Sequence, residues 1–281
     1  DHCTGHRAVR VVELLEGAEK VDMALMQRMQ FDQVSAYALL ISPYLGELEV
    51  EDPELGTVVD LMREWDGELA ADSPAAAVQQ VFVRRMIART LQDKLGDLTL
   101  RYAGQGPTPL LAEGSGLGNR SLEWLQAALA QSSSPWFDLG NGETRDDVIR
   151  LALRDTVDYL KRELGPEMDD WAWGKLHTLT YAHVLGQVKP LDRLFNRGPF
   201  PLGGSSNTLW ATGATLHDLS SALIIGPPFR FIADLGDLRK CQGLLAPGQS
   251  GQPGSPHYDD QVRAWFQAEY HPMLYAREDV V

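Results

Sequence analysis

The 281-residue chain has few cysteines, no long apolar run and a shortage of basic residues. Its two cysteines, Cys3 and Cys241, are expected to be buried thiols, with a single bridge in an oxidising compartment as the alternative. No apolar run approaches the ~20 residues of a membrane-spanning helix, so no membrane segment is expected. Lys and Arg number 25 against 39 Asp and Glu, a net charge of −14, which argues against a nucleic-acid partner.

The motifs of a self-contained active site are also missing. Ser250 lies in a Gly-Gln-Ser-Gly run whose spacing differs from that of a hydrolase nucleophile elbow. His177 and His183 are six residues apart, on different faces of a helix, so we expect structural histidines there and no zinc site. Residue types and spacing alone therefore predict an α+β domain with no active site of its own.

What the sequence does have is apolar periodicity typical of helices through its first two-thirds. Thr144 and Asp147 form a capping pattern, and Ser73 followed by Pro74 is a favourable helix start. The segment 97–118 is rich in Gly and Pro and is expected to be a connection. Helices are expected at 7–16, at 22–45 with a stop favoured by Pro43, from 73 onward, around 122–129 and at 144–164.

Short segments rich in branched and aromatic residues replace this pattern near the C-terminus. We expect strands at 208–212, 221–225 and 229–235, and a last helix at 259–270. The chain thus divides into a mainly helical region, 1–198, and a strand-rich region, 199–281, and its class is α+β. Two or three strands rarely make an independent sheet, so these strands are expected to join strands from outside this chain.

The C-terminal third carries a more specific signal. Residues 248–261 read GQSGQPGSPHYDDQ, which strongly resembles the closing signature of the penicillin acylase (penicillin amidase) family. A Trp-containing stretch and then residues 270–274 follow, as in that family. Collinear matches lie at 61–67 with 71–77, at 173–177, at 201–204 with Thr208, and at Arg230 with Asp234. The matches extend over residues 7 to 281, so the chain resembles the C-terminal half of the family's β chain.

The resemblance implies an N-terminal-nucleophile hydrolase with a four-layer α/β/β/α sandwich, to which this chain gives outer helices and sheet strands. In that family a precursor cuts itself into an α chain and a β chain, and the β chain then begins with Ser. This Ser attacks an acyl amide, and its own α-amino group, with a pKa near ~7.7–8.0, is the base. Backbone N–H groups and an Asn side chain stabilise the oxyanion. The implied substrates are β-lactam side-chain amides or N-acyl homoserine lactones.

The first residue departs from that pattern, because it is Asp1 and not Ser. The nucleophile and the oxyanion Asn would then lie upstream, and we expect the isolated chain to be inactive. Its partners would be the α chain and the N-terminal part of the β chain of the same precursor, which would complete one larger hydrolase domain. A natural processed chain and an excised fragment are both compatible with this sequence.

One active-site residue of the family has a match here. Residues 4–15 align with the family stretch that carries an Arg close to the catalytic Asn, which places Arg7 at that position. A fixed guanidinium there would orient the oxyanion Asn and the scissile carbonyl. Arg10 is a competing candidate, and an ordinary first-turn arginine is the alternative. Arg7 is preferred because the context from Gly5 to Arg7 matches.

The resemblance also has implications for the remaining candidates. The family needs no His base, so His257 is expected to be a hydrogen-bonded structural residue, and Ser250 is not expected to be the nucleophile. No cofactor is expected, although the assembled family fold admits a structural calcium, for which this chain offers no assigned ligands. The compartment would be periplasmic or secreted. The alternative function is a non-catalytic α+β interaction module that retains the acylase fold.

Overall fold

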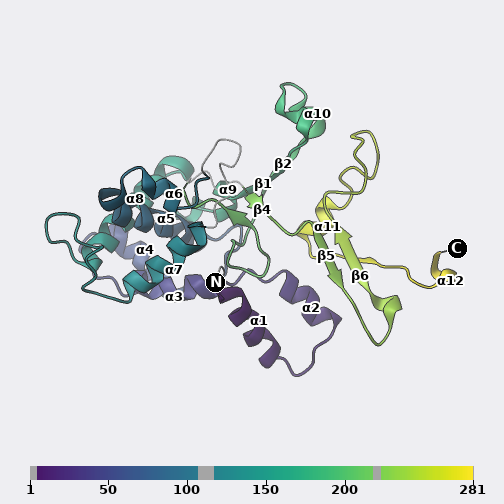
Figure 1. The fold of residues 1–281 in the computed structure, drawn as a ribbon, viewed down its shortest axis with the longest axis horizontal. Coiled ribbons are helices and arrows are strands. Elements are labelled where there is room, and N and C mark those ends of the chain that lie inside the picture. Colours follow the sequence, from purple (N-terminus) through teal and green to yellow (C-terminus); the bar gives the residue numbers. More distant parts are fainter. Residues whose placement is uncertain (1–4, 107–116, 218–222, 281) are drawn as a thin grey trace.

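The computed structural model of the chain describes residues 5–106, 117–217 and 223–280. The molecule is elongated, with a bundle of helices at one end and a three-stranded sheet toward the other (Figure 1). Helix α1 projects from the bundle, and the arm that carries α10 projects separately. Cys3 lies outside the described residues, whereas Cys241 is buried.

Helices dominate the first two-thirds of the described chain. They are α1 His6–Glu16, α2 Met23–Gln30, α3 Ala36–Gly46, α4 Pro53–Glu64, α5 Pro74–Leu95, α6 Leu98–Tyr102, α7 Leu117–Leu129, α8 Arg145–Leu164 and α9 Trp173–Leu176, followed by the short α10 Asp192–Phe195, α11 Val262–Phe266 and α12 Arg277–Val280. Single 3₁₀ turns lie at Met168–Asp170, Val184–Gln187 and Leu238–Lys240. Among the helices described, none combines the length and apolar character needed to span a membrane.

Helices α5 and α8 form the centre of the bundle. Val78, Phe82 and Met86 recur at every fourth residue of α5, and each is fully buried. Ile149 and Leu153 of α8 belong to the same core, and the two helices pack side by side. Burial of each such side chain stabilises the fold by about 1.5–3 kcal/mol. The pair is therefore a rigid base for the loops that follow.

Side-chain caps decide where these helices begin. The Ser73 hydroxyl accepts a backbone N–H of the first turn of α5, and Thr144 and Asp147 form a reciprocal capping box at the start of α8. Both predicted starts are confirmed. The predicted single helix at 22–45 is wrong, because the Ser35 side chain caps a second start and divides the segment into α2 and α3.

Pro43 does not end α3, contrary to the prediction. The helix continues to Gly46 because Ile41 and Leu45, on either side of the proline, are fully buried in the bundle. Pro43 itself is on the exposed side, where water can satisfy the carbonyl that loses its helical partner. Helix α4 lies outside the predicted helices, although Asp52 caps it and a proline follows directly.

The strands are short and form three separate antiparallel sheets within the described ranges. They are β1 Thr178–Tyr181, β2 Arg197–Pro201, β3 Gly213–Ala214, β4 Leu223–Ile225, β5 Phe229–Ile232, β6 Gln242–Leu245 and β7 His271–Pro272. β1 pairs with β2, β3 pairs with β4, and β6 lies between β5 and β7. The α+β class is therefore as predicted, but the strands are spread over more of the chain than the sequence predicted.

The strand-rich region begins earlier than expected. β1 precedes the predicted boundary at residue 198, which falls inside β2, because a four-residue strand is too short to show a clear alternating pattern. Strands occur within the predicted segments 221–225 and 229–235, although residues 221 and 222 lie outside the described part. The predicted helix at 259–270 is reduced to α11, since Ala268 takes a left-handed conformation (φ 54°) shortly after it.

The glycine at position 174 is required by the close packing of α9 on the loop that precedes α5. The Gly174 N–H donates to the Ala71 carbonyl (N···O 2.6 Å), and a Cβ at Gly174 would lie 3.0 Å from the Ala71 Cβ and 2.9 Å from the Pro201 Cβ. We expect Gly174→Ala to lower the free energy of unfolding by about 1–3 kcal/mol through overpacking. Gly251→Ala is the control, because nothing lies within 4 Å of its Cβ position. Equal urea-unfolding midpoints for the two variants would contradict this prediction.

Candidate functional site

Arg7 lies in the first turn of α1, at the edge of an open depression with a volume of about 520 Å³. One wall of the depression is α1 itself, through Arg7 and Val11. Another wall is the loop 205–213, through Asn207 and Leu209. Arg7 is exposed, so its guanidinium is accessible to a ligand or to another part of the protein.

Helix α1 is attached to the bundle through His6 and Arg10. His6, the only buried residue of α1, packs its ring against Tyr37 of α3 with the ring centroids 5.3 Å apart. One turn later the Arg10 guanidinium donates two hydrogen bonds to the Asp32 carboxylate, from Nε to Oδ1 at 3.0 Å and from Nη2 to Oδ2 at 2.7 Å. Arg7 directly follows His6, so its side chain is turned by about 100° around the helix axis from that buried contact and is exposed.

The structure thus separates the two candidate arginines. Arg10 is committed to Asp32, and this hydrogen bonding raises the pKa of its guanidinium. Arg7, unlike Arg10, lines the depression. Of the two, Arg7 is the one placed to meet a ligand there, and its catalytic role stays a prediction.

Buried hydroxyl groups fix the loop 203–212. The Thr208 Oγ1 accepts the Ser205 N–H at 2.9 Å, and the Thr212 hydroxyl donates to the Gly203 carbonyl at 2.7 Å. Both threonines are fully buried. These side-chain bonds take the place of a strand ladder, so the strand predicted within this loop is wrong.

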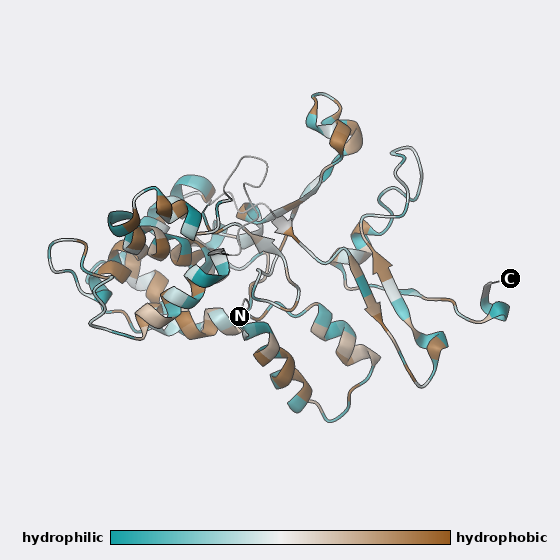
Figure 2. Ribbon diagram, viewed as in Figure 1, coloured by the Kyte–Doolittle hydropathy of each residue, from teal (hydrophilic) through white to brown (hydrophobic). Residues whose placement is uncertain are grey.

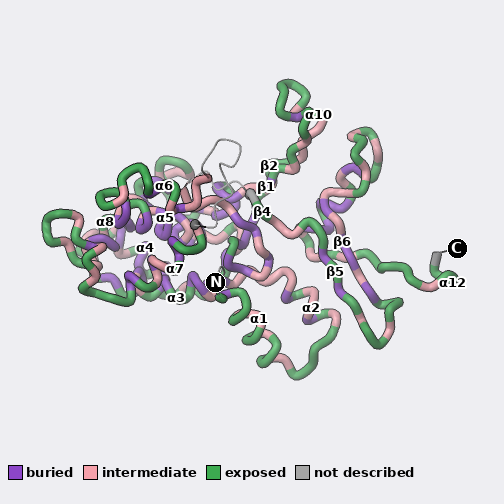
Figure 3. Tube along the Cα trace, in the orientation of Figure 1, coloured by how far each residue is buried: buried purple, intermediate pink, exposed green. Residues whose placement is uncertain are grey.

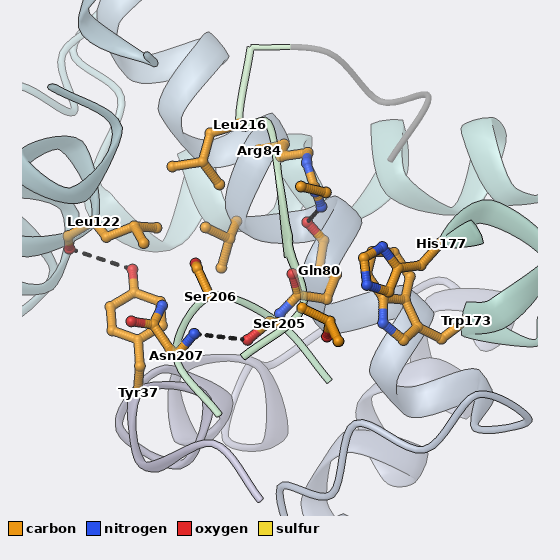
Figure 4. A pocket seen from close by; sticks show the side chains of 13 residues that line it. Tyr37, Gln80, Arg84, Leu122, Trp173, His177, Ser205, Ser206, Asn207 and Leu216 are labelled. Carbon is orange, nitrogen blue, oxygen red and sulfur yellow. Dashed lines mark hydrogen bonds between the residues drawn. The ribbon is translucent and has the colours of Figure 1, made fainter. Parts of the chain in front are cut away.

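Trp173 packs against the buried side of the loop 203–212 (Figure 4). Its indole N–H donates to the Gly204 carbonyl at 3.0 Å, and its ring stacks on His177 with centroids 4.8 Å apart. Both side chains are buried, so Trp173 is a packing residue, and the expected structural role of His177 is confirmed. Here the loop closes over a cavity of about 20 Å³, enough for about one water molecule. Ser206 and Asn207 line both this cavity and the open depression.

The attachment of α1 through His6 is expected to depend on pH. Burial lowers the pKa of its imidazole from the ordinary 6.5, while a hydrogen bond to Gln126 and the charge of Glu123 oppose the effect. The folded protein therefore favours neutral His6, so this contribution to stability is complete above pH 6.5 and declines as the pH falls below it.

We expect the free energy of unfolding to fall more between about pH 7.5 and about pH 5.5 in the wild-type protein than in His6→Phe. The phenyl ring keeps the contact with Tyr37 but takes up no proton. Urea unfolding of both proteins across this range measures the difference. The same pH dependence in both would show that His6 contributes nothing to it.

The closing signature at 248–261 lies elsewhere, beside the sheet β5–β6–β7. It lines a second depression, of about 740 Å³, together with residues of that sheet. His257 Nδ1 is 2.8 Å from Asp260 Oδ2, so the expected hydrogen-bonded His257 is confirmed. The Ser250 hydroxyl accepts the Gln252 N–H, which ties the loop to itself. In the part of the chain that the structure describes, three or more His, Cys, Asp or Glu side chains nowhere converge to hold a metal ion.

Arg230 of β5 has an environment that its sequence neighbours do not reveal. The residue is 3% exposed, and its Nη1 donates to the Trp265 carbonyl at 2.8 Å. Its guanidinium carbon lies 5.0, 5.5 and 4.9 Å from the ring centroids of Phe31, Trp210 and Trp265. Burial lowers the pKa of Arg230 to about 10, so it stays charged at neutral pH. The cation therefore joins the sheet to the loop 203–212 through aromatic faces.

Comparison with known proteins identifies the relatives of this chain. The family model described as penicillin amidase matches residues 2–281. Acyl-homoserine lactone acylase QuiP of Pseudomonas aeruginosa is 27% identical, over 94% of this chain and 34% of that protein. Penicillin acylase 2 proenzyme of Pseudomonas sp. (strain SE83) is 27% identical, over 87% of this chain and 31% of that protein. The chain thus spans about a third of the length of these curated relatives.

A solved structure gives the same answer for the fold. The thermostable penicillin G acylase of Alcaligenes faecalis superposes with a TM-score of 0.56 at 16% sequence identity, over 99% of this chain and 50% of that chain. The superposition confirms the predicted α+β fold of the penicillin acylases. Similarity at this level of identity concerns the fold and not the substrate.

Proposed function

The chain belongs to the penicillin amidase family, and from this premise we propose that it is the C-terminal portion of the β chain of an amidohydrolase that cleaves acyl amide bonds. The observation that carries the proposal is the family match over residues 2–281, with Arg7 located at an open depression. By name, the relatives act as acylases on acyl-homoserine lactones or on penicillin. The proposed substrates are accordingly N-acyl homoserine lactones or β-lactam side-chain amides.

The proposed reaction uses a serine outside these 281 residues, at the N-terminus of the β chain. Its hydroxyl adds to the amide carbonyl while its own α-amino group takes the proton. The tetrahedral intermediate collapses, the C–N bond breaks and the leaving amine receives that proton. Water then hydrolyses the acyl ester. The planar guanidinium of Arg7 holds the oxyanion Asn and the carbonyl in the reactive geometry, and no cofactor takes part.

The exposed side of α1 supports a larger assembly around this site. Val9, Val12 and Leu15 recur at every third residue of the helix that carries Arg7, are 50%, 49% and 36% exposed and form an apolar stripe. Figures 2 and 3 show that this helix carries hydrophobic residues and is mostly exposed. Phe229 and Phe231, on the outward face of β5, are also about half exposed. Neighbouring apolar side chains exposed on one face favour an interface there. We propose that the α chain and the N-terminal part of the β chain cover these faces.

The test is hydrolysis by the whole protein expressed from its full-length gene. The substrates are a long-chain N-acyl homoserine lactone, penicillin G and a chromogenic phenylacetyl amide, and the free amine is measured. Turnover of at least one of them is expected. A processed, folded protein that releases amine from none of the three would contradict the proposal and favour the non-catalytic interaction module.

The proposal extends to maturation and compartment. One relative is itself named a proenzyme, which agrees with a precursor that cuts itself to expose the nucleophile. We propose that the mature enzyme acts in the periplasm or outside the cell. Fractionation of the native cells, with the amidase activity followed, distinguishes this from an enzyme retained in the cytoplasm.

A further inference from the structure

The segment between α2 and α3 contacts both walls of the Arg7 depression. The Asp32 carboxylate receives the two hydrogen bonds from Arg10 of α1, at 3.0 and 2.7 Å. The backbone carbonyl of the same residue accepts the Trp210 backbone N–H at 3.0 Å. The adjacent Phe31 ring stacks on Trp210 with centroids 4.2 Å apart. One residue therefore joins the helix that carries Arg7 to the loop 205–213.

The link to α1 matters because α1 is otherwise held mainly at its N-terminal end. His6 is the only buried residue of the helix. A helix fixed at one point can pivot, whereas Arg10 adds a second point about 6 Å farther along the axis. Arg7 lies between His6 and Arg10 in the sequence. The two attachments therefore fix the position of the Arg7 backbone, from which its side chain extends.

The link to the loop sets the other wall. Trp210 is buried, and Leu209 directly before it lines the depression. A hydrogen bond that fixes the Trp210 backbone therefore also fixes the position of Leu209. The side chains of Arg10 and Asp32 are only 21% and 12% exposed, and a two-pronged guanidinium–carboxylate contact has one preferred geometry. The connection is rigid at both ends.

We propose that Asp32 is a positioning residue, which holds Arg7 and the loop 205–213 at the separation that amide hydrolysis needs. The inference rests on the proposed function and adds to it a residue that does not touch the substrate. Asp32→Asn keeps the size of the side chain and the backbone carbonyl but loses the charge and one prong of the contact. Its effect therefore reports on the placement of α1.

The experiment compares Asp32→Asn with Asp155→Asn in the whole protein. Asp155 of α8 makes the same two-pronged contact with Arg89 of α5, at 2.5 and 2.7 Å, within the helical bundle. We expect Asp32→Asn to lower kcat about tenfold or more with little change in KM, since small misplacements of reacting groups are costly. Asp155→Asn should leave kcat near the wild-type value even if it lowers the melting temperature.

A second comparison separates positioning from simple destabilisation. In an Arg7→Ala background, Asp32→Asn should lower kcat no further, because the residue that it positions is gone. An undiminished further loss in that background, or a wild-type kcat for Asp32→Asn alone, would overturn the proposal. If Asp32→Asn does not fold, Arg10→Lys is tested in its place. This variant keeps the charge but not the planar fork, so the same loss in kcat is expected.

A readout that needs no activity distinguishes this inference from the proposed function. Hydrogen exchange should accelerate in α1 in Asp32→Asn, because the contact with Arg10 is weakened. Residues 205–213 should keep most of their protection, because the backbone carbonyl that accepts the Trp210 backbone N–H is still present. Neither segment should change in Asp155→Asn. Unchanged protection of α1 in Asp32→Asn would overturn the link whatever the protein hydrolyses. A wild-type protein without amidase activity would overturn the proposed function, and with it the catalytic purpose of the link, even where exchange shows the link itself.

Discussion

In the whole protein, Arg7→Ala is expected to lower kcat by about a hundredfold or more while KM changes far less. A group that orients the oxyanion Asn and the reacting carbonyl acts in the transition state, so its loss appears in kcat. Arg7 is exposed and makes little of the attachment of α1, which rests on His6 and Arg10. The melting temperature should therefore change little. Steady-state kinetics on a folded variant measure the effect.

Two further variants sharpen this prediction. Arg7→Lys keeps the charge but loses the planar fork, so it should recover little of the lost rate. Arg28→Ala removes an exposed arginine from the last turn of α2 and should leave kcat unchanged. Arg10 is unsuitable as a control because its contact with Asp32 positions α1. Near wild-type hydrolysis by a folded Arg7→Ala protein would show that the assignment of Arg7 is wrong.

The second large effect concerns the 281-residue chain by itself, which is expected to hydrolyse none of the three test amides. A hydroxyl nucleophile near neutral pH needs an adjacent base. In the described part of the chain, the Ser250 hydroxyl instead accepts a backbone N–H, and His257 pairs with Asp260. Assay of the purified chain should therefore give only the background rate. Turnover that co-purifies with this chain, and disappears when Ser250 is replaced, would refute the prediction.

The parts of the fold that follow from local chemistry could be predicted from the sequence. The caps at Ser73 and Thr144 and the four-residue periodicity of α5 and α8 depend on near neighbours in the chain. The resemblance carried by residues 248–261 gave the family, which the match over the chain confirms. The resemblance did not predict which residues surround Arg7, because those residues lie in other parts of the sequence.

The parts that escaped prediction depend on contacts between distant residues. The environment of Arg230 is assembled from Phe31, Trp210 and Trp265, which no local pattern brings together. The loop 203–212 looked like a strand because its residues favour one, but buried hydroxyl bonds hold it in turns. The contact between Arg10 and Asp32 spans a helix, a loop and a second helix. Such pairs become visible only in three dimensions.

The central claim is that the nucleophile is an N-terminal serine outside residues 1–281, and labelling of the whole native protein tests it most directly. The protein is treated with phenylmethylsulfonyl fluoride until hydrolysis stops, digested, and the modified peptide is located by mass spectrometry. We expect a single sulfonyl adduct on a serine that is the first residue of its polypeptide and lies outside the present sequence. An adduct that accounts for the lost activity on a residue within it, Ser250 for example, would contradict the account.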